Sequence, residues 1–329
     1  MRTRLLPLAL LIALASAGCG REGAPDGPLA GEEAEGTAEI GAFEEELTGT
    51  IRADGSSTVG PFTTLAAERF RKEEPGVRVT VGISGTGGGF ERFCAGETDI
   101  SNASRPIKDE EKRACERKGV EFVELQIAND ALSVVVNPEN DWVDCLSVGA
   151  LQKIWRPGST VESWRDVDSD FPDEKLSLFG PGTDSGTFDY FTDEINGEEG
   201  ASRNDYSATE DDNVIVRGVS GEKGGLGYFG FSYFEQNKEE LKALEIDAGD
   251  GCVAPSVKTV QDGSYKPLAR PLLIYVKQEA LARFEVEAFV QFILDSERQI
   301  AEKALFVPLT DMQLQKTQAK LDATLSGIG

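Results

Sequence analysis

The sequence predicts an α/β fold, and three observations support this. Strand-like and helix-like segments alternate from about residue 50 onward, which is the pattern of α/β proteins. Three strand-like segments end in a loop of Gly, Ser and Thr that leads into a helix. The run "ALSVVVN" (131–137) has the near-continuous hydrophobicity of a strand buried on both faces. The 329 residues contain no internal repeat and are enough for two domains of ordinary size.

Short apolar runs and helical spacing of apolar residues define the expected elements. Strands are expected, in order, at 50–53, 77–83, 131–137, 176–180, 213–219 and 267–276. Helices are expected at 62–74, from residue 90 to 96, after residue 187 and at 279–297. In the third helix, for example, Phe188, Phe191 and Ile195 recur at the spacing of one helix face.

The N-terminus, "MRTRLLPLALLIALASAGCG", has the plan of a secretory signal. Two arginines precede an apolar run that is too short to span a bilayer as a stable helix. The stretch "ASAGC" resembles the bacterial lipobox, although Ser16 stands where such motifs usually have Leu. We therefore expect residues 1–18 to be a signal peptide and Cys19 to be acylated, with plain secretion as the alternative.

Residues 19–47 are rich in Gly, Ala and Glu and contain almost no large apolar side chains. Such a segment cannot bury a core, so we expect a disordered tether. The folded part is expected to start near Thr48.

The chain is acidic and contains no histidine. Its formal net charge of −25 leaves no basic surface for nucleic acid, and any anion site must attract its ligand locally. The absence of histidine excludes Ser–His and Cys–His catalysis and removes the usual zinc ligand. We expect no metal site and no cofactor.

Four cysteines remain after Cys19, an even set that suits an oxidising compartment. They allow three pairings. We favour Cys94–Cys115, which closes a short loop, and Cys145–Cys252, which joins distant segments. A redox or metal role is the minor alternative, because no CxxC motif is present.

The three glycine- and hydroxyl-rich loops are "ADGSSTVGP" (53–61), "GISGTGGG" (82–89) and "GPGTDSGT" (180–187). Ligands of open α/β sheets bind beyond the carboxyl ends of strands, and helix N-termini attract anions. A single such loop is explained equally well by helix capping or turn formation. Three such loops at the same structural position favour an anion site. Arg105 in "SNASRPI" (101–107) is the candidate counter-charge for the anion, and the alternative for this arginine is an ordinary surface ion pair.

These motifs, together with "GGLGYFGFSYF" (224–234), resemble the periplasmic phosphate-binding proteins of bacterial phosphate ABC importers. The resemblance extends from about residue 50 to "FVPL" (306–309). It implies a type II periplasmic-binding-protein fold, in which two α/β domains are joined by two crossover strands with the ligand cleft between them. We place the crossovers near 132–137 and 252–258, with domain I at 48–133 plus 256–329 and domain II at 134–255.

The resemblance also implies the ligand-binding residues. The first loop supplies Ser57, Thr58 and the Val59 amide. Thr86 matches a ligand serine of the family in a loop one residue longer, so Gly85 and Ser84 stay open as alternatives. The third loop supplies the Ser-Gly-Thr of the family, which is Ser185, Gly186 and Thr187 here.

The sequence departs from the family at two positions. Pro181 stands where many members have an arginine, and Ser104 stands where they have an aspartate. Our hypothesis is that Arg105 replaces the arginine. The resemblance implies that the family's aspartate accepts the proton of bound phosphate. Asp130 is the first candidate to replace it here, although it could equally cap the start of its strand. Asp184 is the second candidate.

The function implied is a monomeric, lipid-anchored extracytoplasmic receptor that binds inorganic phosphate and delivers it to an ABC permease. A receptor for sulfate or another tetrahedral oxyanion is the alternative. A hydrolase would need Ser185 or Ser84 beside a lysine, and none lies between Lys175 and Lys223, so no enzymatic activity is expected. A purely structural surface protein would leave the three loops unexplained.

Overall fold

A computed structural model describes residues 46–328 of the chain. The predicted signal peptide, Cys19 and nearly all of the predicted tether lie outside the described residues. Leu47, which was assigned to the tether, packs against the hydrophobic core, so the folded part includes at least this residue before Thr48. No helix within residues 46–328 combines the length and hydrophobicity needed to cross a bilayer.

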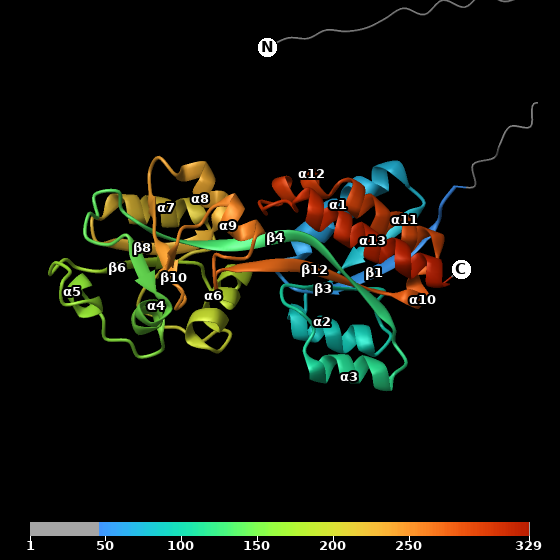
Figure 1. Ribbon diagram of the computed structural model, residues 1–329, viewed down its shortest axis with the longest axis horizontal. Coiled ribbons are helices and arrows are strands. Elements are labelled where there is room, and N and C mark those ends of the chain that lie inside the picture. Colours follow the sequence, from blue (N-terminus) through green and yellow to red (C-terminus); the bar gives the residue numbers. More distant parts are fainter. Residues whose placement is uncertain (1–45, 329) are drawn as a thin grey trace, which may run out of the picture. The chain divides into compact units, whose positions relative to one another are not determined.

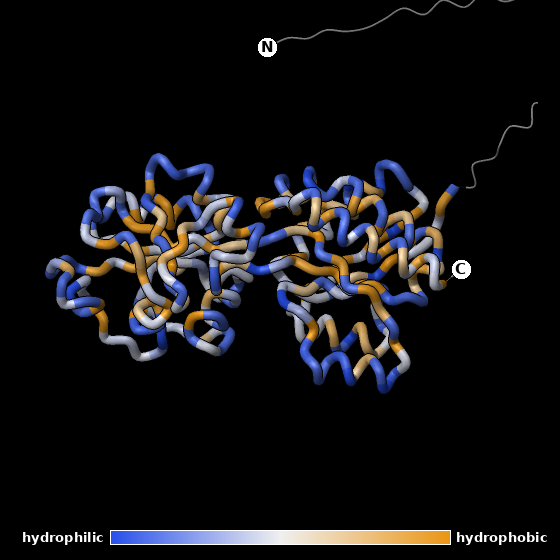
Figure 2. Tube along the Cα trace, in the orientation of Figure 1, coloured by the Kyte–Doolittle hydropathy of each residue, from blue (hydrophilic) through white to orange (hydrophobic). Residues whose placement is uncertain are grey.

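One mixed sheet organises the fold. Within residues 46–328 it has nine strands, in the order β2-β1-β3-β12-β4-β8-β6-β7, with β9 also paired to β4. Their bounds are β1 Gly49–Gly55, β2 Val77–Val81, β3 Ile100–Ala103, β4 Phe122–Val136, β6 Ser177–Gly180, β7 Ser207–Ala208, β8 Gly225–Gly230, β9 Lys242–Ala243 and β12 Ala269–Lys277. Figure 2 shows the hydrophobic residues concentrated on the inner strands, with hydrophilic residues on the outer loops.

Within the described residues, the hydrophobic core consists of two large clusters along this sheet and a smaller third one around Phe90, Phe93 and Tyr275. We call residues 46–130 and 270–328 the first lobe, and residues 131–269 the second lobe. Buried side chains from Ile51 to Ala128 and from Leu272 to Leu321 pack in the first lobe. Those from Ala131 to Leu268 pack in the second, joined by Val307. The mixed α/β architecture with a divided core agrees with the predicted fold class.

The strands β4 and β12 connect the lobes. The first half of β4 pairs with β12 and its second half with β8, and both strands run side by side from one lobe into the other (Figure 1). Their antiparallel register places Arg270 directly opposite Asp130. The predicted first crossover at 132–137 lies on β4, just past this point.

The second crossover lies later in the chain than predicted. Val260, Tyr265 and Leu268 are buried in the core of the second lobe, so the chain returns at β12 and not at 252–258. The apolar side chains between 260 and 268 keep this segment with the second lobe. We propose the two lobes as the two domains, with the boundary at 255–256 moved to about residue 269.

Helices cover both faces of the sheet in the first lobe. They are α1 Gly60–Glu73, α2 Gly85–Cys94, α3 Asp109–Arg117, α10 Gln278–Leu281, α11 Phe284–Asp295, α12 Glu297–Lys303 and α13 Asp311–Ile328. Figure 1 shows α1, α11 and α13 on one face and α2 and α3 on the other. The helix predicted at 279–297 is interrupted, because the backbone is extended at Arg283 and leaves helical geometry at Ser296.

The second lobe contains α4 Val148–Trp155, α5 Trp164–Val167, α6 Gly186–Asn196, α7 Asp212–Gly221, α8 Phe231–Asn237 and α9 Val257–Gln261. The prediction of a strand at 213–219 was wrong, because this segment is α7. The Asp211 carboxylate caps the helix by accepting from the Asn213 amide. Ile215, Val216 and Val219 then recur at helical spacing and are buried, so packing overrides their β-propensity.

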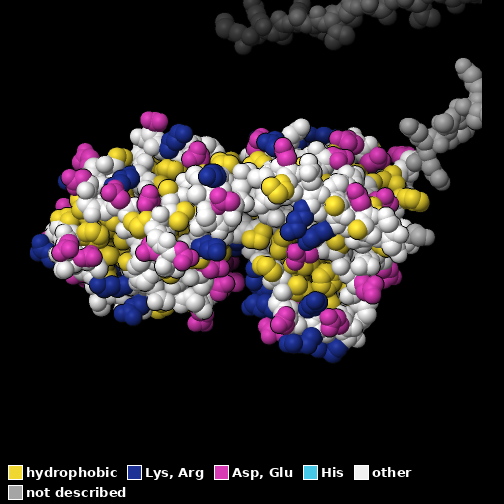
Figure 3. All heavy atoms as spheres, in the orientation of Figure 1, with side chains coloured by type: hydrophobic (Ala, Val, Ile, Leu, Met, Phe, Trp, Pro, Cys, Tyr) yellow, Lys and Arg dark blue, Asp and Glu magenta, His cyan; other side chains and the backbone are white. Residues whose placement is uncertain are grey.

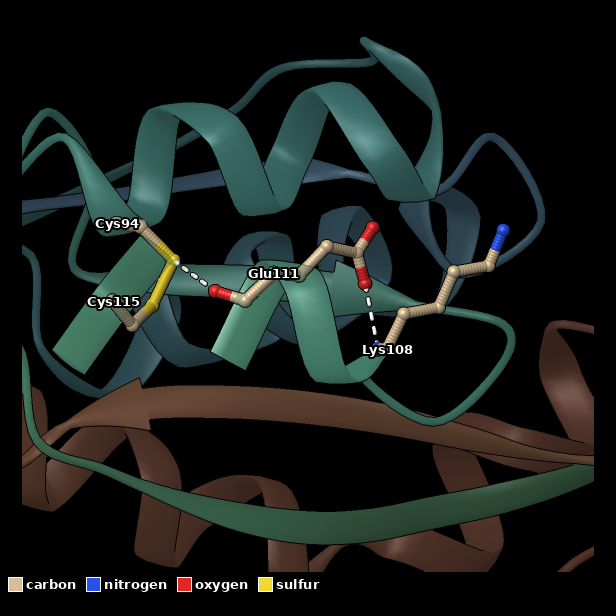
Figure 4. Close-up of a disulfide and its surroundings, with 4 residues drawn as sticks. All are labelled: Cys94, Lys108, Glu111 and Cys115. Atoms are coloured by element: carbon tan, nitrogen blue, oxygen red, sulfur yellow. Dashed lines mark hydrogen bonds between the residues drawn. A yellow bond between two sulfur atoms is a disulfide. The ribbon is translucent and has the colours of Figure 1, made fainter. Parts of the chain in front are cut away.

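Both favoured cysteine pairs are disulfide-bonded in the structure. Cys94–Cys115 joins α2 to α3 (Figure 4). Cys145–Cys252 fastens the ends of a small sheet made of β5 Cys145–Ser147, β10 Glu245–Asp247 and β11 Cys252–Val253. Glu245 lies within 4.8 Å of both sulfurs of this second pair, but their disulfide leaves no thiolate to bind a metal.

Candidate functional site

A cavity of about 370 Å³ lies between the two lobes. The first lobe contributes residues from the loops after β1 and β3 and from the start of α2, and the second contributes α6 and the segment before β12. The cavity therefore lies where the three predicted loops meet.

The first loop brings Ser56, Ser57 and Thr58 to the cavity. It follows the carboxyl end of β1 and leads into α1, which Phe62 anchors in the core. Val59, predicted to offer its amide, is fully buried and does not line the cavity. Its N–H donates to the Ser56 Oγ at 3.4 Å. Ser57 and Thr58 thus reach the cavity as predicted, whereas Val59 does not.

The second loop is shorter than predicted, because α2 already begins at Gly85. Gly85 and Thr86 line the cavity. The Ser84 Oγ donates to the Asp54 Oδ1 at 2.7 Å and so turns away from the cavity. The Thr86 Oγ1 lies 3.1 Å from the Ser104 Oγ and accepts from the Ser104 amide at 3.3 Å. This contact brings a hydroxyl from α2 and one from the end of β3 together on one wall.

The third loop delivers the N-terminus of α6. The Ser185 Oγ caps the helix by accepting from the Thr187 amide at 3.1 Å. Gly186 lines the cavity, whereas Ser185 and Thr187 do not. The position of α6 is fixed by Phe191, whose ring stacks on Tyr228 of β8 with 3.7 Å between centroids. The N-terminus of α6, with its free amide groups, therefore faces the cavity at Gly186.

Arg105 lines the cavity, but its charge is largely committed to Glu111. Its Nη1 and Nη2 donate to the two carboxylate oxygens of Glu111 at 2.9 and 2.8 Å, which raises the pKa of Arg105. Glu111 is held in turn by the Lys108 amide, and its carbonyl oxygen lies 3.6 Å from the Cys94 Sγ (Figure 4). The guanidinium thus sits in a rigid ion pair at the edge of the site.

Arg270 also lines the cavity, and the sequence analysis missed it. Its side chain is only 9 % exposed. Its Nε donates to the Asp130 Oδ2 at 3.1 Å and its Nη2 to the Thr58 Oγ1 at 2.9 Å. The guanidinium carbon lies 3.7 Å from the centroid of the Tyr190 ring. The only signal in the sequence was an arginine inside the apolar strand "PLARPLLIYV".

Asp130 does not itself line the cavity and reaches it only through Arg270. Its carboxyl group is buried, and this burial raises its pKa, while Arg270 acts in the opposite direction. Asp184, the second candidate acceptor, is exposed and does not line the cavity. Neither predicted acceptor therefore faces the cavity directly.

The second-lobe wall is acidic. Four carboxylates line it, from Asp189, Asp193, Glu194 and Glu199, beside the single amine of Lys266. Figure 3 shows the hollow between the lobes from one side, with acidic side chains on this wall and basic side chains on the facing wall. Burial raises the pKa of Asp189, which lies in the first turn of α6. Among the residues that line the cavity, positive charge for an anion thus comes from Arg105, Arg270 and Lys266, in addition to the helix N-termini.

Comparisons with known proteins agree with this architecture. A family model described as the PBP superfamily domain matches residues 41–297. The protein SphX of Synechococcus elongatus is 49 % identical over 262 residues, covering 79 % of this chain and 77 % of SphX. The phosphate-binding protein PstS of Staphylococcus saprophyticus is 41 % identical over 278 residues, covering 83 % of this chain and 85 % of PstS.

Solved structures show the same relationship. A crystal structure of a possible phosphate binding protein from Planctomyces limnophilus is 45 % identical with a TM-score of 0.82, covering 85 % of this chain and 99 % of that one. A protein from Clostridium perfringens, assigned as a phosphate ABC transporter substrate-binding protein and solved with bound phosphate, is 25 % identical with a TM-score of 0.56. The comparison covers 100 % of that chain and 80 % of this one. The chain therefore belongs to the PBP superfamily, in the family of the phosphate-binding protein PstS and its relative SphX.

Proposed function

We propose that this chain is a receptor that binds inorganic phosphate and delivers it to an ABC-type permease. The observation that carries this proposal is the cavity between the lobes, where Thr58, Thr86 and Gly186 meet beside Arg270. Relatives of this chain carry the name phosphate-binding protein, and one related structure contains bound phosphate. The chemistry of the cavity suits the same ligand.

Hydroxyl groups and helix N-termini provide the donors that a tetrahedral oxyanion needs. Ser57, Thr58 and Thr86 present hydroxyls from the first lobe, and α6 presents its N-terminus from the second. Helix N-termini carry roughly half a positive charge and free amide groups, which favours anions. These local attractions are necessary because the whole chain carries a formal charge of −25. We keep Ser57, Thr58, Gly85, Thr86, Ser104 and Gly186 as the proposed ligand-binding set, whereas Arg105 lines the cavity but donates to Glu111.

Closure of the lobes about β4 and β12 would hold the anion away from water. The walls come from different lobes, and the connections between them are two adjacent strands. Hinge closure of this kind sequesters a ligand between domains. Release to a permease would then require the lobes to separate.

We further propose that the receptor works outside the cytoplasm as a monomer anchored by lipid at Cys19. The location and the anchor are supported by the sequence of residues 1–19 and by the two disulfides, which suit an oxidising compartment. Metabolic labelling with a radioactive fatty acid tests the anchor, because Cys19→Ala should abolish incorporation. Incorporation that persists in this variant would contradict acylation at Cys19.

We propose that the chain has no hydrolytic activity. The Ser185 Oγ accepts a hydrogen bond from the helix it caps and does not line the cavity. The Ser84 Oγ donates to Asp54, and Ser84 does not line the cavity. Phosphatase and esterase assays of the purified protein should give no turnover above the buffer rate, and turnover abolished by Ser185→Ala would overturn this proposal.

Equilibrium binding with phosphate and sulfate in competition, between pH 5 and pH 8, tests the proposed function. Phosphate carries a proton over this range and sulfate does not, so a site with a carboxylate acceptor prefers phosphate. We expect phosphate to bind more tightly at every pH. Equal affinity for the two anions, or a preference for sulfate, would contradict the assignment to phosphate. The protein would then be assigned as a receptor for sulfate or another tetrahedral oxyanion.

A further inference from the structure

We infer that Arg270, on the strand that joins the lobes, is the cation that binds the anion, and that Asp130 positions it. This inference rests on the proposed function, since it names the charged ligand of the same cavity. It replaces the hypothesis that Arg105 does so, and it reassigns Asp130 from a ligand to a positioning residue.

The guanidinium of Arg270 is fixed on three sides. Asp130 binds its Nε, Thr58 accepts from its Nη2, and the ring of Tyr190 covers one face. The Tyr190 hydroxyl is itself anchored, because it donates to the Pro267 carbonyl oxygen at 2.5 Å. A guanidinium held in this way loses little further freedom when it binds a ligand.

One edge of the guanidinium is left to a ligand. In the part of the chain that the structure describes, Nη1 of Arg270 has no hydrogen-bond partner, although nine-tenths of the side chain is buried. The same residue lines the cavity. Because the planar fork of an arginine matches the oxygen spacing of phosphate, Nη1 and Nη2 together suit bidentate binding of a tetrahedral anion.

Arg105 differs in how its donors are used. Both of its terminal nitrogens donate to Glu111, and its side chain is 28 % exposed. An anion could recruit Arg105 only by breaking this bidentate pair. Arg270 meets Asp130 through Nε, the nitrogen farthest from the fork, and so keeps its terminal edge for the ligand.

The position of Arg270 also connects ligand binding to the hinge. It lies opposite Asp130 in the register of β12 and β4, where these strands pass between the lobes. Its contacts extend to Thr58 of the first lobe and Tyr190 of the second. An anion bound by Arg270 is therefore held at the point about which the lobes move.

Asp130 has a positioning role in this arrangement. Its buried carboxylate compensates the charge of Arg270 before the anion arrives and sets the direction of the guanidinium through Nε. Without this partner the arginine would be an uncompensated buried charge, which is strongly unfavourable. Asp130 is thus expected to affect the anion through Arg270 and not by contact.

Isothermal titration calorimetry with inorganic phosphate tests the role of Arg270. We expect Arg270→Gln to raise the Kd by about 10- to 100-fold, the range for loss of hydrogen bonds to a charged group. Arg270→Lys should fall between the wild type and Arg270→Gln, because it keeps the charge but loses the fork. Arg105→Gln should raise the Kd by less than Arg270→Gln.

The matched control is Arg298→Gln, which removes the same charge from an exposed position on α12 outside the cavity. It should leave the Kd within twofold of wild type. Circular dichroism establishes that each variant is folded. If Arg270→Gln binds phosphate like the control, or if Arg105→Gln costs more, the inference is overturned. Wild-type protein that fails to bind phosphate would instead overturn the proposed function itself.

A double-mutant cycle tests the positioning role of Asp130. We expect Asp130→Ala to weaken phosphate binding in the wild-type background but to cause no further loss in the Arg270→Gln background. Asp130→Asn, which keeps an acceptor for Nε, should retain more affinity than Asp130→Ala. Additive losses in the double variant would show that Asp130 acts independently of Arg270, contrary to this inference.

Discussion

Gly186 at the start of α6 lies so close to Thr58 that a β-carbon on Gly186 would come within 2.6 Å of the Thr58 Oγ1. The same carbon would lie 2.9 Å from the Ser57 Oγ and 3.2 Å from the Thr58 amide nitrogen. Gly186 belongs to the second lobe and Thr58 to the first, so the absence of a side chain permits the lobes to meet at the cavity.

Gly186→Ala should hold the lobes apart. Overpacking typically costs about 1–3 kcal/mol, which corresponds to a rise in the Kd for phosphate of roughly 5- to 150-fold. Small-angle scattering should show a smaller radius of gyration on addition of phosphate to the wild type and a reduced change in Gly186→Ala. Gly149→Ala is the matched control, since its β-carbon would meet only the Ser147 Oγ at 3.8 Å. Normal affinity and compaction in Gly186→Ala would refute this steric account.

Asp189 is the carboxylate we expect to select phosphate over sulfate. It lines the cavity within the first turn of α6, and burial raises its pKa. At pH 8 it would accept the proton of bound hydrogen phosphate and repel sulfate. Asp189→Asn should therefore reduce the phosphate-over-sulfate preference by about tenfold or more, measured by competition.

Two comparisons sharpen this prediction. Asp184→Asn, at an exposed position of the loop that precedes α6, should leave the preference unchanged. Asp130→Asn should weaken both anions alike, because Asp130 contacts Arg270 and does not line the cavity. A preference that shifts in Asp130→Asn but not in Asp189→Asn would return the acceptor role to Asp130.

Glu297 should make the stability of the protein fall between pH 4.5 and pH 7. Burial raises its pKa to about 7 from 4.5, although its carboxylate accepts from the Leu309 amide at 2.8 Å. In this window the folded state binds more protons than the unfolded state, so the free energy of unfolding decreases as the pH rises. Asp212, with a pKa raised to about 6, acts in the same direction.

The chain has no histidine, so no imidazole titrates in this window. Glu297→Gln keeps an acceptor for Leu309 and should be more stable than wild type at pH 7 by about 1–3 kcal/mol, with little difference at pH 4. Urea unfolding at the two pH values measures this. An equal difference between the proteins at both values would mean that Glu297 does not titrate in this range.

The Cys145–Cys252 disulfide should stabilise the fold without affecting the ligand. It closes a long loop, with a sequence separation of 107, and fastens a small sheet whose cysteines do not line the cavity. Replacing both cysteines by serine should lower the free energy of unfolding by about 3–5 kcal/mol. Phosphate affinity of the folded variant should stay within twofold of wild type, and a larger loss would tie this disulfide to the site.

The loops of the cavity could be predicted from the sequence because their chemistry is local. Gly, Ser and Thr between a strand and a helix serve the same backbone geometry wherever they occur, so Thr58, Thr86 and Gly186 were predicted and do line the cavity. Which atoms are left for a ligand is not local. The Val59 amide turns to Ser56 and the Ser84 hydroxyl to Asp54, and only the folded structure shows these partners.

The role of Arg270 and the helical conformation of α7 could not be predicted from the sequence. The register that brings Arg270 opposite Asp130 joins residues 140 positions apart, and no local pattern encodes it. In "NVIVRGV" the β-branched residues favour a strand, but the Asp211 cap and burial of one face favour a helix. Tertiary packing decided both cases.

A crystal structure of the protein with phosphate is the most direct test of the central claim, which is that the anion binds between the lobes at Arg270. We predict one phosphate in the cavity, within hydrogen-bonding distance of the Arg270 fork, the Thr58 hydroxyl and the N-terminus of α6. A phosphate bound elsewhere, or one held in the cavity by Arg105 with Arg270 turned away, would contradict it.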